Sequence, residues 1–426
     1  MSKIHNMLRE STTTSSSMIG RPNLVALTRA TTKLIYGDIV AQQRTTQPIA
    51  ALYGIKYLTP DNELSFVTGA TYGGAIGSKE REGMTEFTTA GAAGITKGML
   101  FKYQNVVYKA MEDTPFDGIT GDESEMLMEA IILLTIRTVP DAAPVTKYET
   151  GDGSNVSESK FLINKWNASV KSRKLKSSLT IELAQDMEAN GLDTPNFIED
   201  LLATEMADEV NKDILQSLVT VSKRYKVTGV CDKGIIDLTY DRAPEASRKL
   251  YELVCEMVSH IQRTTSYTAT FVVASTRVGA LLAGSGWLKH KPEDDKYLSP
   301  NAYGFLVNGL PVYVDTNTPA DYVTVGVKED FGEKEMVGSL FYAPYTEGLD
   351  LDDPEHVGTF KVIVDPDSLQ PSVALMVRYA LCANPYTVAK DDKEARIIDA
   401  SDMDKMAGQS DMSVLLGVKL PKLIED

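Results

Sequence analysis

The residue types that catalysis and metal binding require are scarce and widely spaced in this chain of 426 residues. Neither H-E-x-x-H nor Cys-x-x-Cys occurs, so no pattern typical of zinc ligands is present. The serine of GSGW at 284–287 lacks the G-x-S-x-G context of a nucleophile elbow, and a helix end explains the segment better. The sequence therefore predicts no enzyme, no catalytic residue, no metal site and no cofactor. The four histidines, each at least 30 residues from the next, are His5, His260, His290 and His356.

Three further motifs could bind ligands, but each has a simpler interpretation. GAAGITKG at 91–98 does not satisfy the phosphate-loop pattern G-x-x-x-x-G-K-[ST], which favours a turn. The acidic run EGLDLDDPE at 347–355 lacks the spacing of a calcium-binding EF-hand loop, which favours a solvated loop. Aromatic residues at 98–116 could form a sugar-stacking face, although the core of a small module is the more frequent explanation: Phe101, Tyr103, Tyr108 and Phe116.

Charge separates two neighbouring segments more clearly than any motif. Five basic residues fall within 165–176 with no acid among them, while acidic residues recur along 199–213. Opposite charges attract, so we expect the two segments to pair, either within one chain or between copies; the alternative is two solvated faces. The candidate contacts between copies are Lys165, Lys171, Arg173, Lys174, Lys176, Glu205, Asp208 and Glu209.

A short triplet near the start of the chain could be a processing site. Leu8-Arg9-Glu10 precedes the polar run STTTSSS at 11–17, whose composition is typical of a flexible segment that a protease can reach. Similar triplets at 127–129, 250–252 and 423–425 show that the pattern alone is not specific.

The charged segments require a long helix and a long strand to position them. Residues 193–225 predict one helix: Pro195 suits its first position, and apolar residues recur every four residues from Ile198 to Leu218. At about 1.5 Å per residue this helix is about 45 Å long, and its winding stripe needs partners on more than one side. Residues 161–182 alternate apolar and polar side chains, as a half-buried strand does, and 47–58 also predict a strand.

The remaining patterns indicate an α+β protein of two or three domains. Glycines break 61–160 into short pieces, which predicts a small β-rich module containing a hairpin at 98–112 and a short helix at 122–134. A helix at 244–263 and a strand pair at 360–364 and 373–381 follow the long helix.

Bulk composition excludes several classes of protein. The net charge of −16 argues against a protein that coats nucleic acid, which needs an excess of Lys and Arg. No apolar run is long enough to span a membrane, and the first residues lack a secretory signal. The three cysteines are odd in number and far apart, so they predict no disulfide framework and fit a reducing compartment: Cys231, Cys255 and Cys382.

Five runs of sequence closely resemble the capsid vertex proteins of T-even-type tailed bacteriophages, and the resemblance covers essentially the full length. It is weakest over about 73–160. The runs are RPNLVALTRATTKLIYGDIVAQQRTTQPIAALYGIKYL at 21–58, KWNASVKSRKLKSSLTIELAQDMEANG at 165–191, LLATEMADEVNKDILQSL at 201–218, GWLKHKPEDDKYLS at 286–299 and FYAPYTEGLDLDDPEHVGTFKVIVDPDSLQPS at 341–372.

The resemblance implies the tailed-phage capsid fold first described for phage Hong Kong 97, with a small insertion domain on its extended loop. It also implies cleavage after the triplet Leu8, Arg9 and Glu10, so that Ser11 becomes the mature N-terminus. The implied divisions are a propeptide at 1–10, an N-terminal arm at 11–46, an extended loop at 47–60 and 161–182, an insertion domain at 61–160, a peripheral domain at 183–229 and 336–384 with the spine helix 193–225, an axial domain at 230–335, and a C-terminal segment at 385–426.

The function implied by this resemblance is structural. Subunits would form homopentamers at the icosahedral vertices of the virion, beside hexamers of a major capsid protein, after synthesis in the host cytoplasm. Assembly partners would be a scaffold and the prohead protease, with no membrane and no sequence-specific nucleic acid. Two alternatives stay open: a hexamer-forming major capsid paralogue of the same fold, and a glycan-binding surface protein acting through the insertion domain.

Overall fold

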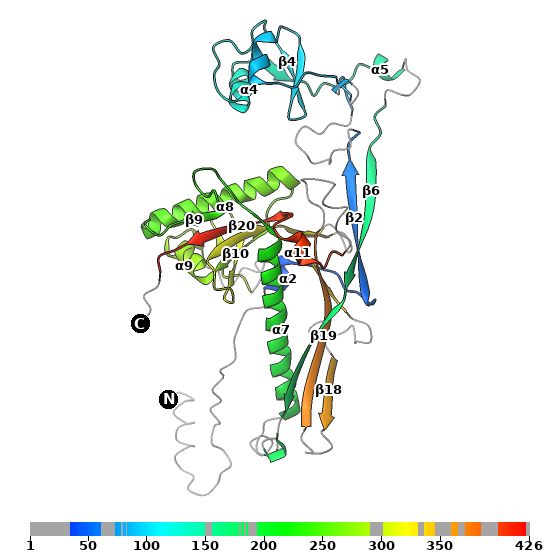
Figure 1. Cartoon of the computed structure of the whole chain (residues 1–426), viewed down its shortest axis with the longest axis vertical. Coiled ribbons are helices and arrows are strands. Elements are labelled where there is room, and N and C mark those ends of the chain that lie inside the picture. The colour runs from blue at the N-terminus through cyan, green and yellow to red at the C-terminus, as the bar shows by residue number, and fades with distance from the viewer. Residues whose placement is uncertain are drawn as a thin grey trace, which may run out of the picture. The chain divides into compact units, whose positions relative to one another are not determined.

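Figure 1 shows the helices and strands of the computed structural model of the chain, which divides into two compact units. The first consists of Met1–Leu34, Ser172–Val210 and Leu349–Val377, and the second of Ile35–Lys171, Asn211–Gly348 and Arg378–Asp426. The structure describes residues 35–60, 73–77, 80–81, 83–149, 156–178, 180–182, 185, 194–289, 301–330, 336–345, 359–364, 371–384 and 399–422.

In the first unit, strands β18 (Thr359–Val364) and β19 (Pro371–Ala383) form an antiparallel pair, as the sequence predicts. Thr359 lies opposite Met376, and Val364 lies opposite Pro371. Strand β7 (Lys171–Ser178), which carries most of the basic residues, also pairs with β19. The basic segment is therefore part of a sheet.

The long helix α7 (Thr194–Val221) confirms the predicted spine but ends four residues early. Residues 222–224, predicted as its last turn, form strand β8 (Ser222–Arg224), which pairs in parallel with β20 (Ser410–Lys419). The Ser222 hydroxyl lies 2.5 Å from the Leu218 carbonyl and 2.8 Å from the Ser413 hydroxyl. Pairing with a distant strand thus overrides the local helical pattern. The apolar stripe is buried as predicted, at Ile198, Leu202, Met206, Val210, Ile214 and Leu218.

An eight-stranded sheet forms the main core of the second unit. Its order is β11 (Leu288–Lys289), β12 (Gly304–Leu306), β13 (Pro311–Asp315), β10 (Phe271–Ser275), β14 (Tyr322–Gly326), β20 and β8, with β9 (Ile235–Asp237) also paired to β20. Strand β20 lies in the segment 385–426, which the family resemblance separates from the axial domain expected at 230–335. A strand from the C-terminal segment therefore completes this sheet.

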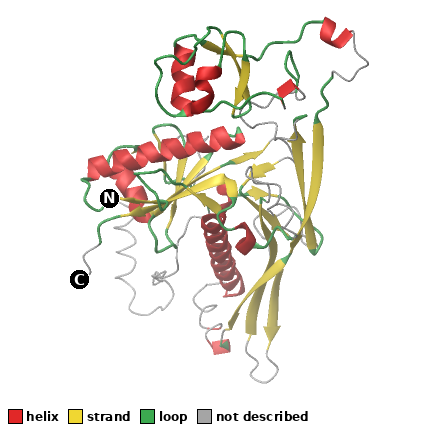
Figure 2. Cartoon of the chain, turned by 45° about the horizontal axis from the view of Figure 1, so that its top comes forward, coloured by secondary structure: helices red, strands yellow, loops and turns green. Residues whose placement is uncertain are grey.

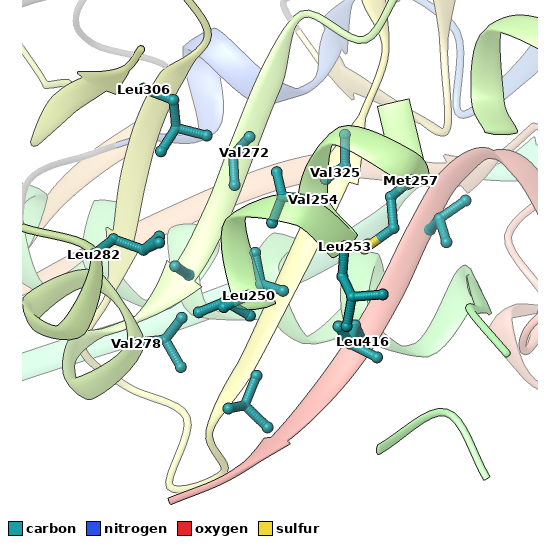
Figure 3. Packing of buried hydrophobic residues seen from close by; sticks show 14 of the residues in the cluster. Leu250, Leu253, Val254, Met257, Val272, Val278, Leu282, Leu306, Val325 and Leu416 are labelled. Carbon is teal, nitrogen blue, oxygen red and sulfur yellow. The ribbon is translucent and has the colours of Figure 1, made fainter. Parts of the chain in front are cut away.

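Helices α8 (Ala243–Thr265) and α9 (Thr276–Gly284) supply apolar side chains to the same core. Figure 3 shows side chains of α8 packed towards strands of the sheet, where Val272, Val325 and Leu416 meet them. Burial of each such side chain contributes about 1.5–3 kcal/mol relative to exposure, so this cluster is a principal source of stability. Its α8 members include Leu250, Leu253, Val254, Met257 and Ile261.

Among the short elements of the second unit, β17 (Leu340–Pro344) pairs in parallel with β1 (Ala41–Gln42) and antiparallel with the second half of β19. The others are the helices α2 (Tyr36–Ile39), α5 (Thr146–Glu149) and α11 (Met403–Met406), and the paired strands β15 (Lys328–Asp330) and β16 (Met336–Gly338).

A small module has its own apolar core, as the glycine-rich segment predicts. It contains a 3-10 helix, η1 (Thr89–Gly94), strands β3 (Leu100–Tyr103), β4 (Val106–Ala110) and β5 (Ile136–Thr138), and helix α4 (Glu123–Ile132). Phe101, Tyr108 and Phe116 are buried in this core, and Tyr103 packs against it. The aromatic residues therefore hold the module together rather than present a sugar-stacking face.

A two-stranded antiparallel ribbon confirms the strand predicted at 47–58 and the first part of that predicted at 161–182 (Figure 2). Strand β2 (Ile49–Leu58) pairs with β6 (Lys160–Ser169) over its whole length, with Ile49 opposite Ser169 and Leu58 opposite Lys160. Mixed helices and strands throughout the described residues confirm the α+β class.

A titratable cluster lies where α7 passes into the sheet. The ammonium group of Lys223 lies 2.6 Å from the carboxylate of Asp411, which is 4% exposed. The ring of His260 lies 5.9 Å from that of Tyr225, whose hydroxyl donates to Glu256 at 3.1 Å. Burial and the charges of Lys223 and Arg263 lower the pKa of His260, although Asp411 opposes them.

Acid should therefore weaken this junction through His260. The unfolded chain binds the proton near the ordinary pKa of 6.5, whereas the folded chain binds it only at lower pH. The contribution to stability is present above pH 6.5 and is lost as the pH falls below it. Thermal unfolding of the wild type and His260→Gln at a series of pH values tests this. The wild type should lose more Tm on acidification, and parallel curves would contradict the assignment.

Candidate assembly surfaces

The charged residues predicted to join copies of the chain lie on three elements. Lys165 lies on β6, and the acidic candidates lie on α7. The other four basic candidates lie on β7: Lys171, Arg173, Lys174 and Lys176. Lys171, Lys174 and Lys176 are exposed, and so is Glu209, whereas Glu205 is half-buried. Exposure leaves these residues accessible to a neighbour.

Part of the predicted pairing occurs inside one chain. The guanidinium of Arg173 lies 3.2 Å from the Glu209 carboxylate of the same chain, with both side chains partly exposed. Such a pair contributes roughly 0–1 kcal/mol, so it orients β7 against α7 more than it stabilises the fold. Asp213 also has an internal partner, because the Tyr379 hydroxyl donates to it at 2.5 Å.

The structure buries Asp208 and does not describe the predicted processing site. Asp208 is buried, at 5% exposure, because the helix is covered on more than one side; it is therefore not part of an exposed acidic surface. Leu8, Arg9, Glu10 and Ser11 lie outside the described residues.

The ribbon carries an exposed face that is largely apolar. Alternate residues of β2 point to one side, and the register places Tyr53 opposite Lys165, Ile55 opposite Ile163 and Tyr57 opposite Phe161. We call this surface the ribbon face; its large apolar residues, with exposed fractions of 51–68%, are Ile49, Tyr53, Ile55, Tyr57, Phe161 and Ile163.

The opposite side of the ribbon includes Trp166 and Ala168, which are buried. A ribbon with one solvated face normally exposes polar residues on that face. The large apolar side chains on the ribbon face therefore indicate a contact with another protein. The Lys165 ammonium lies 5.6 Å from the centre of the Tyr53 ring and leaves a positive charge on the ribbon face.

The sequence shows this surface only in part. The alternation of Tyr53, Ile55 and Tyr57 is visible in the sequence, but it is the same pattern that buries one face of an ordinary strand. Only the pairing with β6 shows which face the fold covers.

A second exposed apolar surface lies at the end of α4. We call it the cap patch; it consists of Met128, Ile132, Leu133 and Leu134, exposed by 57–77%. Leu134 has φ +61°, in the left-handed region. Its amide donates to the Ile131 carbonyl, and the Thr135 amide donates to the Ala130 carbonyl, each at 3.1 Å. Glycine usually occupies this capping position, and a leucine there costs roughly 1–2 kcal/mol.

The described residues contain few features that suit a small ligand or a metal ion. Among them no group of three or more His, Cys, Asp or Glu side chains could hold a metal ion, and no helix is long and apolar enough to cross a membrane. A cavity of about 140 Å³ lies in the small module, where Arg81 and Asp141 join apolar walls that include Ile76, Val106 and Val139. The prominent features are therefore surfaces that suit contact with other proteins.

The chain is similar in sequence to capsid proteins of tailed phages. The family model described as major capsid protein Gp23 matches residues 17–418. The capsid vertex protein of Enterobacteria phage T4 is 70% identical over 427 residues, covering 100% of both chains. The major capsid protein of the same phage is 30% identical over 248 residues, 53% of this chain and 45% of that protein.

Among solved structures, the asymmetric unit of the bacteriophage PhiM1 mature capsid covers 96% of this chain and 93% of that chain, at 10% identity and a TM-score of 0.41. The family assignment rests on the sequence matches, which span nearly the whole chain. On this basis the chain belongs to the Gp23 family of major capsid proteins.

Proposed function

We propose that this chain is a structural capsid vertex protein, which self-associates into pentamers at the icosahedral vertices of a tailed-phage head. Hexamers of a major capsid protein would surround it, and a scaffold and a prohead protease would act during assembly. The full-length similarity to the vertex protein of phage T4, against a partial match to the major capsid protein, favours the vertex over the hexamer-forming role.

The ribbon face is the observation that supports self-association. Its six large apolar side chains are more than half exposed in the isolated chain. Because each side chain is already partly covered, burying the rest of it contributes roughly 1–2 kcal/mol, and association must offset about 4–15 kcal/mol of lost freedom. A contact that covers the ribbon face can meet that cost, and an extended ribbon reaches a neighbour without distorting the core.

The domain division that we propose differs in one strand from the division that the family resemblance implies. The ribbon is the extended loop, the small module is the insertion domain, and α7 is the spine of the peripheral domain. The axial domain consists of 230–335 together with β20, because that strand pairs with β14 in its sheet.

Imaging of labelled particles tests the vertex assignment. Particles assembled with a tagged copy of this chain should carry the label at the fivefold positions. A matched preparation with the tag on the major capsid protein should carry it over the faces instead. Label from this chain on hexamers would reject the vertex role, and absence of the chain from purified particles would reject the proposed function.

Processing of the N-terminus provides a separate prediction. Glu10→Ala should leave the full-length chain in mature particles, because the protease expected from the family resemblance cuts after Glu10. The control is Glu252→Ala, which alters the similar triplet Leu250-Tyr251-Glu252 inside helix α8 and should not affect processing. N-terminal sequencing decides the matter, and a terminus at Ser11 in the Glu10→Ala particles would refute the assignment.

A further inference from the structure

The isolated chain exposes two separate apolar surfaces, the ribbon face and the cap patch. We propose that in the assembled shell the cap patch of one subunit packs on the ribbon face of a neighbouring copy. This inference rests on the proposed function, since it names the two surfaces through which self-association occurs. It adds the module's helix end as the partner of the ribbon.

The backbone of Leu134 is the first reason. This residue is 77% exposed and adopts φ +61°, so its side chain gains almost no burial from its own chain. A glycine would cap the helix with less strain, and both capping hydrogen bonds come from backbone groups that a glycine also has. The subunit itself therefore offers the leucine side chain little burial to offset this strain, and a contact outside the subunit would supply it.

The chemistry of the two surfaces is the second reason. Both are apolar, but Glu129 is exposed on the last turns of α4, three and four residues before Ile132 and Leu133 of the cap patch, whereas Lys165 is exposed on the ribbon face. Packing one surface on the other brings opposite charges to the rim. Packing two cap patches together would bring carboxylates against carboxylates.

The arrangement that results is heterologous, because each subunit contributes a different surface to each contact. A contact of this type repeats from copy to copy and closes into a ring when the rotation allows. It therefore suits a subunit whose copies surround an axis. Neither surface is left without an apolar partner in such a ring.

Cross-linking in intact particles tests the pairing. The chain would carry Ile132→Cys and Ile163→Cys with Cys255→Ser, because the other two cysteines, Cys231 and Cys382, are buried. A short bismaleimide should then produce covalent multimers on denaturing gels. The matched control replaces Ile163→Cys by Leu162→Cys, which is exposed but lies on the opposite side of β6, and should give far fewer multimers. No excess of multimers over this control would overturn the pairing.

Leu134→Gly gives a second test that does not depend on a cross-linker. The free subunit should melt at the same or a higher temperature, because the glycine relieves the left-handed strain. The particle should be disrupted at a lower temperature, because the contact is lost. Equal or raised particle stability would overturn the inference. Particles that hold this chain at their vertices but fail both tests would leave the proposed function intact.

Discussion

Subunits that carry Ile55→Glu are expected to fold normally but to yield few or no particles. Ile55 is 51% exposed in the isolated chain, so a carboxylate there remains solvated and costs the free subunit little. In the shell the ribbon face is buried against a neighbour, and an unpaired buried charge costs roughly 3–5 kcal/mol at each contact. Because every subunit makes the contact, the penalty recurs around the ring.

The measurement is particle yield by sedimentation and electron microscopy, with circular dichroism of the purified subunit to verify folding. Leu162→Glu is the matched control, since Leu162 is 47% exposed on the other side of the same ribbon. The control should give normal yields. Normal yields from Ile55→Glu as well would mean that the ribbon face is not an assembly contact.

The largest effect on the stability of the subunit is expected from Gly326→Ala in strand β14. A Cβ atom at Gly326 would lie 2.3 Å from the Phe271 ring, closer than any real contact, and the ring is buried in the core. The ring or the sheet must shift, which should lower the free energy of unfolding by about 3 kcal/mol. Chemical denaturation of the purified subunit measures this loss.

A second substitution tests the cause. Phe271→Leu removes ring atoms next to Gly326, so the double variant should be less destabilised than the sum of the two single variants. Gly284→Ala is the control, because no atom lies within 4 Å of the Cβ position there. It should change stability by less than about 0.5 kcal/mol. Additive losses from Gly326→Ala and Phe271→Leu would contradict the steric explanation.

Local patterns in the sequence predict much of this fold, and the differences have physical causes. The four-residue recurrence from Ile198 to Leu218 predicts α7, because only a helix places those residues on one stripe. The same pattern cannot show that the chain leaves the helix at Ser222, since the reason is a strand nearly 190 residues away. Pairing partners that are distant in sequence leave no local signal.

The sequence predicts less of the assembly surfaces than of the fold. Charge patterning indicates contacts through β7 and α7, yet Arg173 pairs with Glu209 of its own chain and Asp208 is buried. The inter-subunit roles of Lys171, Lys174, Lys176 and Glu205 stay predictions. The ribbon face and the cap patch become visible only when the covered sides of β6 and α4 are known. Sequence alone gives periodicity, whereas an interface depends on which side the rest of the chain covers.

Hydroxyl-radical footprinting of the free subunit and of intact particles tests most directly whether subunits hold one another through the ribbon. Tyr53, Tyr57 and Phe161, exposed by 60–68% in the isolated chain, should be strongly modified in the free subunit and protected in the particle. Equal modification of these three side chains in both states would show that the ribbon face stays open in the shell and would contradict this mode of assembly.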